Sequence, residues 1–428
     1  MMMKNKYIIV ILLFLGVGLL SSCVQEMDEI FEDSASARLE NEVNKYRELL
    51  TQPQNGWLME YYPGGRNQAY GGYVITAKFS DDGNVLIQSV LAQDITESEV
   101  SQYTVGKDMG ATLNFVTYNE LFHYFSDPDI GTIGTGLGSG MTGDYEFVFE
   151  TGDAGEIVLT GKKHRSVIYM YPLAQTASEY LIKTKNNMDS FTGIPAAYGL
   201  TGTFEGEPAE AEFISRQSVQ ITQGDETTNF SFMFNDEGVK LYNPISLNDK
   251  KVCDLIWNPQ NRTFSSTDGN TILQVLSNPA GLLLEDLLGD YTLSMVTTSI
   301  IFDITISQDD FGNIVMEGLP FNLYLTYNWK LGVLELTPQY VMRSPDVVTA
   351  IWSARVGPLT WGAGYGLVTK WNGSDDDFVL EFVDNGYEWF SNGERIYADG
   401  FILWDMNASG EYTGFGLSQY VDLMLTKK

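Results

Sequence analysis

The stretch from Lys78 to Ile87, KFSDDGNVLI, places an acidic turn between two runs of strand-forming residues. Asp82-Gly83 suits a tight turn, because glycine adopts positive φ angles without steric cost. The stretch therefore predicts a β-hairpin. Short apolar and aromatic runs on both sides extend the pattern, including GWLMEYYP (56–63), GGYVITAKF (71–79) and EFVFE (146–150). We expect this part of the chain to form antiparallel sheet.

A second stretch, FSFMFNDEGVKLYNPI (230–245), has the same order of strand, acidic glycine turn and strand. It is either a second copy of one β unit or a chance likeness between two hairpins. A short helix around residues 178–188 is expected to separate the two units. We therefore expect an α+β region over 34–282, divided into β subunits at 34–175 and 178–282.

From Leu287 onward the chain is a succession of about ten short apolar runs separated by turns. Such a pattern predicts an antiparallel meander, closed as a barrel or folded as a sandwich. Gly289-Asp290-Tyr291 is similar to the opening of lipocalin-like barrels. The expected fold class is mainly β, with a C-terminal β-barrel (lipocalin-like) or β-sandwich domain over 283–428.

One amphipathic helix is expected before the first strands, over about residues 36–50. Its apolar residues recur at helical spacing on a single face, and Pro53 with Asn55-Gly56 ends it. That stripe consists of Leu39, Val43, Tyr46 and Leu50. We expect this helix to pack on the sheet that follows it.

The first 22 residues read as a secretory signal peptide, with Lys4 and Lys6 before an apolar run and small residues at its end. Leu20-Ser21-Ser22-Cys23 resembles the bacterial lipobox, in which the cysteine receives fatty acyl (palmitate) chains and becomes the N-terminus. The alternative is an ordinary cleavage site beside an incidental cysteine. A multiply acylated Cys23 would anchor the protein lastingly in a membrane.

Residues 23–33 are expected to form a tether. The acidic residues that follow Cys23 are placed similarly to the export signal of surface-exposed lipoproteins in Bacteroidetes-type outer membranes; they are Glu26, Asp28, Glu29, Glu32 and Asp33. The expected location is the outer membrane, lipid-anchored and facing the cell exterior, with a periplasmic orientation as the alternative.

The composition excludes some partners. With 428 residues and a net charge of −31, the chain repels nucleic acid and anionic lipid, whose binding requires lysine and arginine. We expect no nucleic-acid partner and contact with the membrane only through the lipid anchor. Its 44% hydrophobic content predicts a folded chain, and its length predicts more than one domain.

No motif identifies a reaction. The two histidines, His123 and His164, exclude a three-histidine zinc site, and no GxSxG nucleophile motif occurs. We expect no cofactor, no metal and no catalytic residue. A glycoside hydrolase needs only two carboxylates, and with 56 acidic residues no pair stands out.

Tryptophans are concentrated near the C-terminus, where six of eight lie between Trp329 and Trp404. The apolar face of a sugar ring stacks on an indole, so tryptophans near turns are candidates for a glycan platform. Trp361, Trp371 and Trp389 lie beside turns rich in glycine and asparagine, and we select them as candidate ligand-binding residues. The alternative is core packing.

The N-terminal half resembles domain-of-unknown-function (DUF) family 4302, found in lipoproteins of Bacteroidetes-type bacteria. The motifs that carry the resemblance over about residues 30–260 are NGWLMEYYPGG (55–65), GGYVITAKFSDDG (71–83), TYNELFHYFSDP (117–128), GDYEFVFE (143–150) and LTGKK (159–163). The resemblance implies an accessory surface lipoprotein encoded beside nutrient-uptake systems, and binding in preference to catalysis. Within the third motif it makes His123 and Asp127 the polar residues to test first.

The sequence leaves three candidate functions for this protein. The first is a non-catalytic binding or accessory component in glycan or nutrient capture, with a glycan ligand and outer-membrane uptake proteins as partners. The second is a glycoside hydrolase with paired carboxylates. The third is an adhesion or structural subunit that binds a protein.

Overall fold

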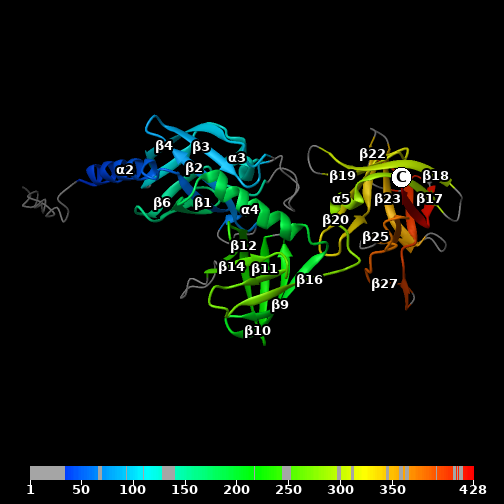
Figure 1. Ribbon diagram of the computed structural model, residues 1–428. Helices are drawn as coiled ribbons and strands as arrows, with labels where there is room; N and C mark the ends of the chain where they lie inside the picture. Colours follow the sequence, from blue (N-terminus) through cyan, green and yellow to red (C-terminus); the bar gives the residue numbers. More distant parts are fainter. Residues whose placement is uncertain are drawn as a thin grey trace, which may run out of the picture.

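The computed structural model describes residues 34–428 except 66–69, 93, 109, 128–139, 216, 243–251, 296–299, 310–312, 344–346, 356–359, 362–365, 392, 408–410, 412 and 414–417. The described chain is mainly β, as the sequence predicts, and its strands close into three antiparallel eight-stranded barrels. Figure 1 shows the barrels in chain order, the first in blue to cyan, the second in green and the third in yellow-green to red. Of the two folds expected for the C-terminal domain, barrel and sandwich, the structure forms the closed barrel.

The first barrel is an up-and-down meander in which β1 closes the sheet by pairing with β8. Its hairpin at β2–β3 is the one that KFSDDGNVLI predicts, with Gly83 at φ +83° in the turn. The strands are β1 Trp57–Tyr62, β2 Tyr73–Phe79, β3 Asn84–Ser89, β4 Glu99–Lys107, β5 Ala111–Phe115, β6 Glu146–Gly152, β7 Ile157–Gly161 and β8 Val167–Pro172.

Two helical segments pack on the core of the first barrel. Helix α2 (Ala35–Thr51) buries Val43, Tyr46 and Leu50 of the predicted apolar stripe, while Leu39 is half-buried. The Tyr46 ring stacks on Phe149 at 3.8 Å between centroids. The Trp57 indole donates a hydrogen bond to the Leu50 carbonyl at 2.8 Å, which holds the helix end to β1. Helix α3 (Glu120–His123) and the 3₁₀ turn η2 (Tyr124–Ser126) contribute Phe122 and Phe125 to the same core.

The second barrel follows helix α4 (Ala177–Thr192), which begins with a capping box between Thr176 and Glu179. It is again a meander, closed between β9 and β16. Its strands are β9 Ala197–Phe204, β10 Glu207–Ser215, β11 Ser218–Gln223, β12 Glu226–Phe234, β13 Gly238–Tyr242, β14 Val252–Asn258, β15 Thr263–Ser265 and β16 Ile272–Ser277.

The first and second barrels are joined by buried polar contacts. Glu60 and Lys240 form an ion pair at 2.5 Å with only 5% and 14% of their side chains exposed. The hydroxyls of Tyr169 and Tyr242 lie 2.6 Å apart. Because α4 also contacts strands of both barrels, the two barrels form a continuous packed unit.

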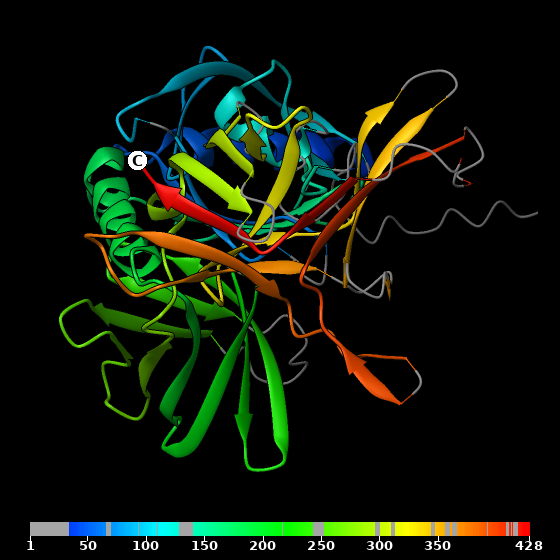
Figure 2. The same ribbon diagram turned by 90° about the vertical axis from the view of Figure 1, so that its right-hand side faces the viewer.

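The third barrel begins at helix α5 (Leu284–Leu287) and contains β17 Gly289–Met295, β18 Ile300–Gln308, β19 Ile314–Glu317, β20 Leu323–Asn328, β21 Val333–Leu336, β25 Leu367–Trp371, β26 Val379–Asp384 and β31 Leu423–Lys427. The intervening strands leave the barrel. They form a side sheet of β22 Gln339–Arg343, β23 Val348–Arg355, β24 Thr360–Trp361, β29 Gly400–Met406 and β30 Ser418–Val421, and a pair of β27 Trp389–Ser391 with β28 Glu394–Ile396. Figure 2 shows β22–β23 and β27–β28 extending beyond the barrel.

Candidate ligand-binding site

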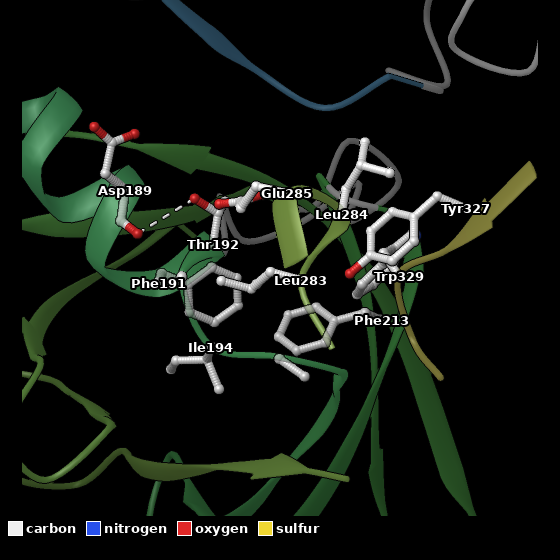
Figure 3. A pocket seen from close by; sticks show the side chains of 12 residues that line it. Asp189, Phe191, Thr192, Ile194, Phe213, Leu283, Leu284, Glu285, Tyr327 and Trp329 are labelled. Atoms are coloured by element: carbon white, nitrogen blue, oxygen red, sulfur yellow. Dashed lines mark hydrogen bonds between the residues drawn. The ribbon is translucent and has the colours of Figure 1, made fainter. Parts of the chain in front are cut away.

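A cavity of about 330 Å³ lies where the second barrel meets the third. The carboxyl end of α4 and the first strands of the second barrel form one wall, while α5 and the β20–β21 turn form the other (Figure 3). The lining residues are Asp189, Phe191, Thr192, Gly193, Ile194, Ala197, Phe213, Leu283, Leu284, Glu285, Tyr327 and Trp329.

Aromatic side chains dominate this lining. Phe191 and Phe213 are buried in the second-barrel core and contact each other at 5.6 Å between ring centroids. Trp329 reaches from the β20–β21 turn to within 6.0 Å of Phe213, and its side chain is half-buried. The hydroxyl of Tyr327 donates to the Leu282 carbonyl at 2.8 Å. The rings are therefore held in place before any ligand enters.

The turn that carries Trp329 is held by the segment before α5 and by the second barrel. Gly332 adopts φ +68°, and its carbonyl accepts a hydrogen bond from the Leu282 amide at 3.0 Å. A β-carbon at Gly332 would lie 2.5 Å from that amide nitrogen, so the close approach requires glycine. Lys330 adds an ion pair with Glu212 at 2.9 Å. These contacts fix the position of the indole relative to Phe213.

Polar groups lie at the rim of the cavity. Asp189 and Glu285 are both exposed, and Asp189 also forms an ion pair with Lys185 one turn earlier on α4. The Thr192 hydroxyl donates back to the Met188 carbonyl at 2.9 Å. The rim therefore offers carboxylate oxygens as hydrogen-bond acceptors, and its negative charge disfavours anions.

The three selected tryptophans lie on strands of three different sheets. Trp361 lies in β24 of the side sheet and Trp389 in β27 of the separate strand pair. Trp371 ends β25 of the third barrel, where its ring is half-buried and lies 6.1 Å from Phe378. Its indole N–H is buried without a hydrogen-bond partner among the described residues. For these three tryptophans the glycan platform stays a prediction, and it is the alternative to a site at Trp329.

His123 and Asp127 do lie close together, at the end of α3 and just after η2. The Asp127 amide donates to the His123 carbonyl at 2.9 Å, and the Tyr118 hydroxyl lies 3.4 Å from the Asp127 carboxylate. Burial lowers the pKa of His123, and its Nδ1 lies 3.1 Å from the Asn119 backbone. The neighbouring Phe122 and Phe125 are core residues of the first barrel. The contacts of His123 and Asp127 therefore hold α3 and η2 against the end of this barrel.

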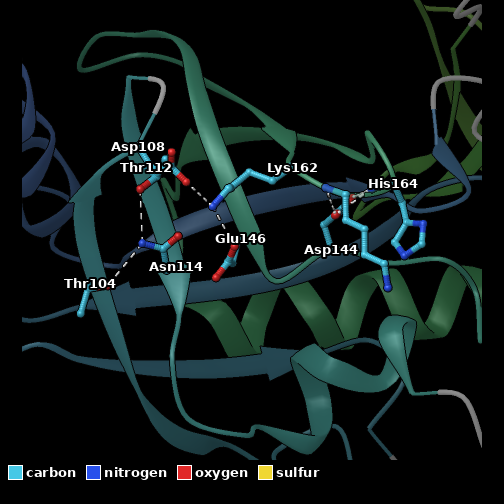
Figure 4. A network of polar contacts seen from close by, with 9 residues as sticks. Thr104, Asp108, Thr112, Asn114, Asp144, Glu146, Lys162 and His164 are labelled. Atoms are coloured by element: carbon cyan, nitrogen blue, oxygen red, sulfur yellow. Dashed lines mark hydrogen bonds and ion pairs between the residues drawn. The ribbon is translucent and has the colours of Figure 1, made fainter.

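The family-like motifs also build structure around Asp144 (Figure 4). The buried Asp144 carboxylate accepts hydrogen bonds from the amides of Lys163, His164 and Ser166 at 2.8, 2.9 and 3.1 Å, and from the Ser166 hydroxyl at 2.6 Å. The Asp144 amide donates to the Tyr61 hydroxyl at 2.7 Å. This carboxylate therefore joins the start of β6 to the β7–β8 turn.

Trp329 is the site residue that the sequence interpretation missed. It lies in TYNWKLG (326–332), a turn with Asn328 and Gly332, so the criterion that selected Trp361 also fits it. Its partners Phe191 and Phe213 lie more than 100 residues away, and no local pattern connects them to that turn.

Cys23 and the preceding signal segment lie outside the described residues. Within the described part of the chain, no helix has the length and apolarity needed to cross a membrane. No three His, Cys, Asp or Glu side chains among the described residues cluster in a way that could hold a metal ion.

Comparison with known proteins gives two family matches. The model described as Domain of unknown function (DUF4302) matches residues 27–259, and a second domain of unknown function, DUF4987, matches residues 267–404. No curated protein matches the chain. The cavity is lined from both matched segments, with Asp189 to Phe213 in the first and Leu283 to Trp329 in the second.

Proposed function

The chain belongs to the DUF4302 family, and from this premise we propose that it is a surface-anchored outer-membrane lipoprotein that binds a glycan or similar nutrient without catalysis. The cavity between the second and third barrels is the binding site of this proposal. Its volume of about 330 Å³ is at the small end of the range of ligand sites. A small sugar or the end of a longer chain suits this size.

The chemistry of the lining supports a neutral sugar. The half-buried Trp329 ring offers a surface on which the apolar face of a sugar stacks, with Phe213 behind it. Sugar hydroxyls can donate to the Asp189 and Glu285 carboxylates at the rim. The same two charges, in a chain of net charge −31, disfavour an anionic ligand at this site.

A glycoside hydrolase is the second candidate, because Asp189 and Glu285 line one cavity from different elements. Glycosidases use such pairs, with one carboxyl group shielded from water so that it keeps its proton. Here both carboxylates are exposed, and Asp189 forms an ion pair with Lys185. These features favour binding over hydrolysis.

The sequence supports the anchored location. The signal segment before Cys23, the lipobox-like Leu20-Ser21-Ser22-Cys23 and the acidic residues after it fit an exported lipoprotein. Residues 23–33 would connect the lipid to α2, the first described helix, and hold the three barrels away from the membrane.

A glycan array of the lipid-free protein, starting at residue 24, tests the binding site. Trp329→Ala is expected to weaken binding of any recognised glycan by about 30-fold, which corresponds to about 2 kcal/mol for a central aromatic contact. Trp361→Ala, Trp371→Ala and Trp389→Ala serve as matched controls and are expected to bind as the wild type does. The bound glycans are expected to be recovered uncleaved.

Two results would overturn the proposal. If the folded protein binds no glycan, capture of glycans is excluded and a protein ligand becomes the better explanation. If binding survives Trp329→Ala and is lost in one of the three controls, the site lies elsewhere on the third barrel or its side sheets.

A further inference from the structure

A second cavity, of about 200 Å³, lies on the outer face of the first barrel beneath the first turn of α4. Its floor is the β2–β3 hairpin, in which Thr76 pairs with Gln88 and Lys78 with Leu86. The lining residues are Gln54, Asn55, Thr76, Ala77, Lys78, Leu86, Gln88, Thr176, Ala177 and Ser178. This set contains amides, hydroxyls and one ammonium group, and it contains no aromatic ring.

The charge of this lining is opposite to that of the chain. Lys78 is its one ionisable side chain, whereas the whole chain has a net charge of −31. Lys78 is exposed and forms no ion pair with any described residue. An unpaired cation in a hollow without acidic lining attracts an anion.

The first turn of α4 adds to this preference. A helix of 16 residues begins here, and its Ala177 and Ser178 amides have no partner in the described chain. Glu179 faces the same turn, but its carboxylate accepts hydrogen bonds from the Thr176 amide at 3.0 Å and hydroxyl at 2.7 Å. The helix terminus carries about half a positive charge, part of which Glu179 offsets.

Two largely buried polar side chains, Thr76 and Gln88, line the cavity with hydrogen-bonding capacity to spare. Thr76 is 3% exposed, and its hydroxyl makes no hydrogen bond with any described residue. Gln88 is 8% exposed and has only a long contact, 3.4 Å, from its amide nitrogen to the Ser178 hydroxyl. A free hydroxyl and a weakly bonded amide in one cavity can bind the hydroxyl groups of a ligand.

We propose that this cavity binds a small, singly charged, hydroxyl-bearing anion of the sugar-carboxylate class. The carboxylate would lie near Lys78 and the Ala177 and Ser178 amides, and the hydroxyls would bond to Thr76 and Gln88. One lysine and a partly offset helix terminus balance about one negative charge, which fits a carboxylate better than a phosphate group carrying up to two. The inference does not depend on the cavity beside Trp329.

Isothermal titration of the lipid-free protein with galacturonate, galactose and inorganic phosphate tests this site. Galacturonate is expected to bind more tightly than galactose or phosphate. Lys78→Gln is expected to weaken its binding about tenfold, and Thr76→Val about fivefold. Lys370→Gln is the matched control, since Lys370 is an exposed lysine on β25 of the third barrel, and it should leave the affinity unchanged.

Three outcomes would overturn the proposal. Equal affinity for galactose and galacturonate would show that the carboxylate is not recognised. Tighter binding of phosphate would assign the site to a different anion. An equal loss of affinity in Lys78→Gln and Lys370→Gln would show a general charge effect without a defined site.

Discussion

Replacing Asp144 with alanine is expected to lower the free energy of unfolding of the first barrel by about 3–5 kcal/mol. The carboxylate is 4% exposed and accepts four hydrogen bonds, from the amides of Lys163, His164 and Ser166 and from the Ser166 hydroxyl. Without it, these donors are left buried between β6 and the β7–β8 turn. A loss of this size exceeds that of most single substitutions.

Urea unfolding followed by fluorescence measures this change. Trp57, buried in the first barrel, is the one tryptophan of residues 34–175, and the other seven lie beyond it, so Asp144→Ala is expected to shift the part of the fluorescence change that comes from Trp57. Asp153→Ala is the matched control, because the Asp153 carboxylate also accepts backbone amides, at 2.7 and 3.1 Å, but in an exposed turn. Its midpoint is expected to stay near that of the wild type. An Asp144→Ala midpoint equally close to wild type would refute the role assigned to Asp144.

Replacing Cys23 with serine is expected to abolish lipid attachment and to move the protein from the membrane fraction to the soluble fraction. Each buried CH₂ of an acyl chain contributes about 0.8 kcal/mol, so loss of the acylated sulfur removes the whole anchor. Labelling cells with a palmitate analogue, followed by fractionation, measures both effects.

The control is Cys253→Ser, which changes the only other cysteine of the chain, in β14. This variant should keep its label and stay with the membrane. Continued labelling of Cys23→Ser would show that Cys23 is not the lipidated residue. Protease added to intact cells then distinguishes the exterior from the periplasmic orientation.

Local sequence patterns predicted the strands and the first helix well. KFSDDGNVLI forms β2–β3, and the helix expected over residues 36–50 is α2, Ala35–Thr51. Closure of the first two barrels was not predicted, because it depends on pairing such as Trp57 with Pro172 across more than 100 residues. Nothing in either strand indicates its distant partner.

For the candidate site too, the local pattern was visible in the sequence and the distant contacts were not. Aromatic residues beside glycine turns were the class that the sequence selected, and Trp329, which lines the cavity, belongs to it. Which of these turns faces a cavity depends on Phe191 and Phe213, placed by α4 and the second barrel. The sequence could therefore suggest the chemistry, but the location required the packing of two barrels.

The most direct test of glycan capture is a crystal structure of the lipid-free protein with the glycan that it binds most tightly. Electron density for a sugar ring is expected in the cavity between α4 and the β20–β21 turn, stacked on Trp329. Sugar density against Trp361 or Trp389, with the cavity beside Trp329 empty, would contradict this prediction.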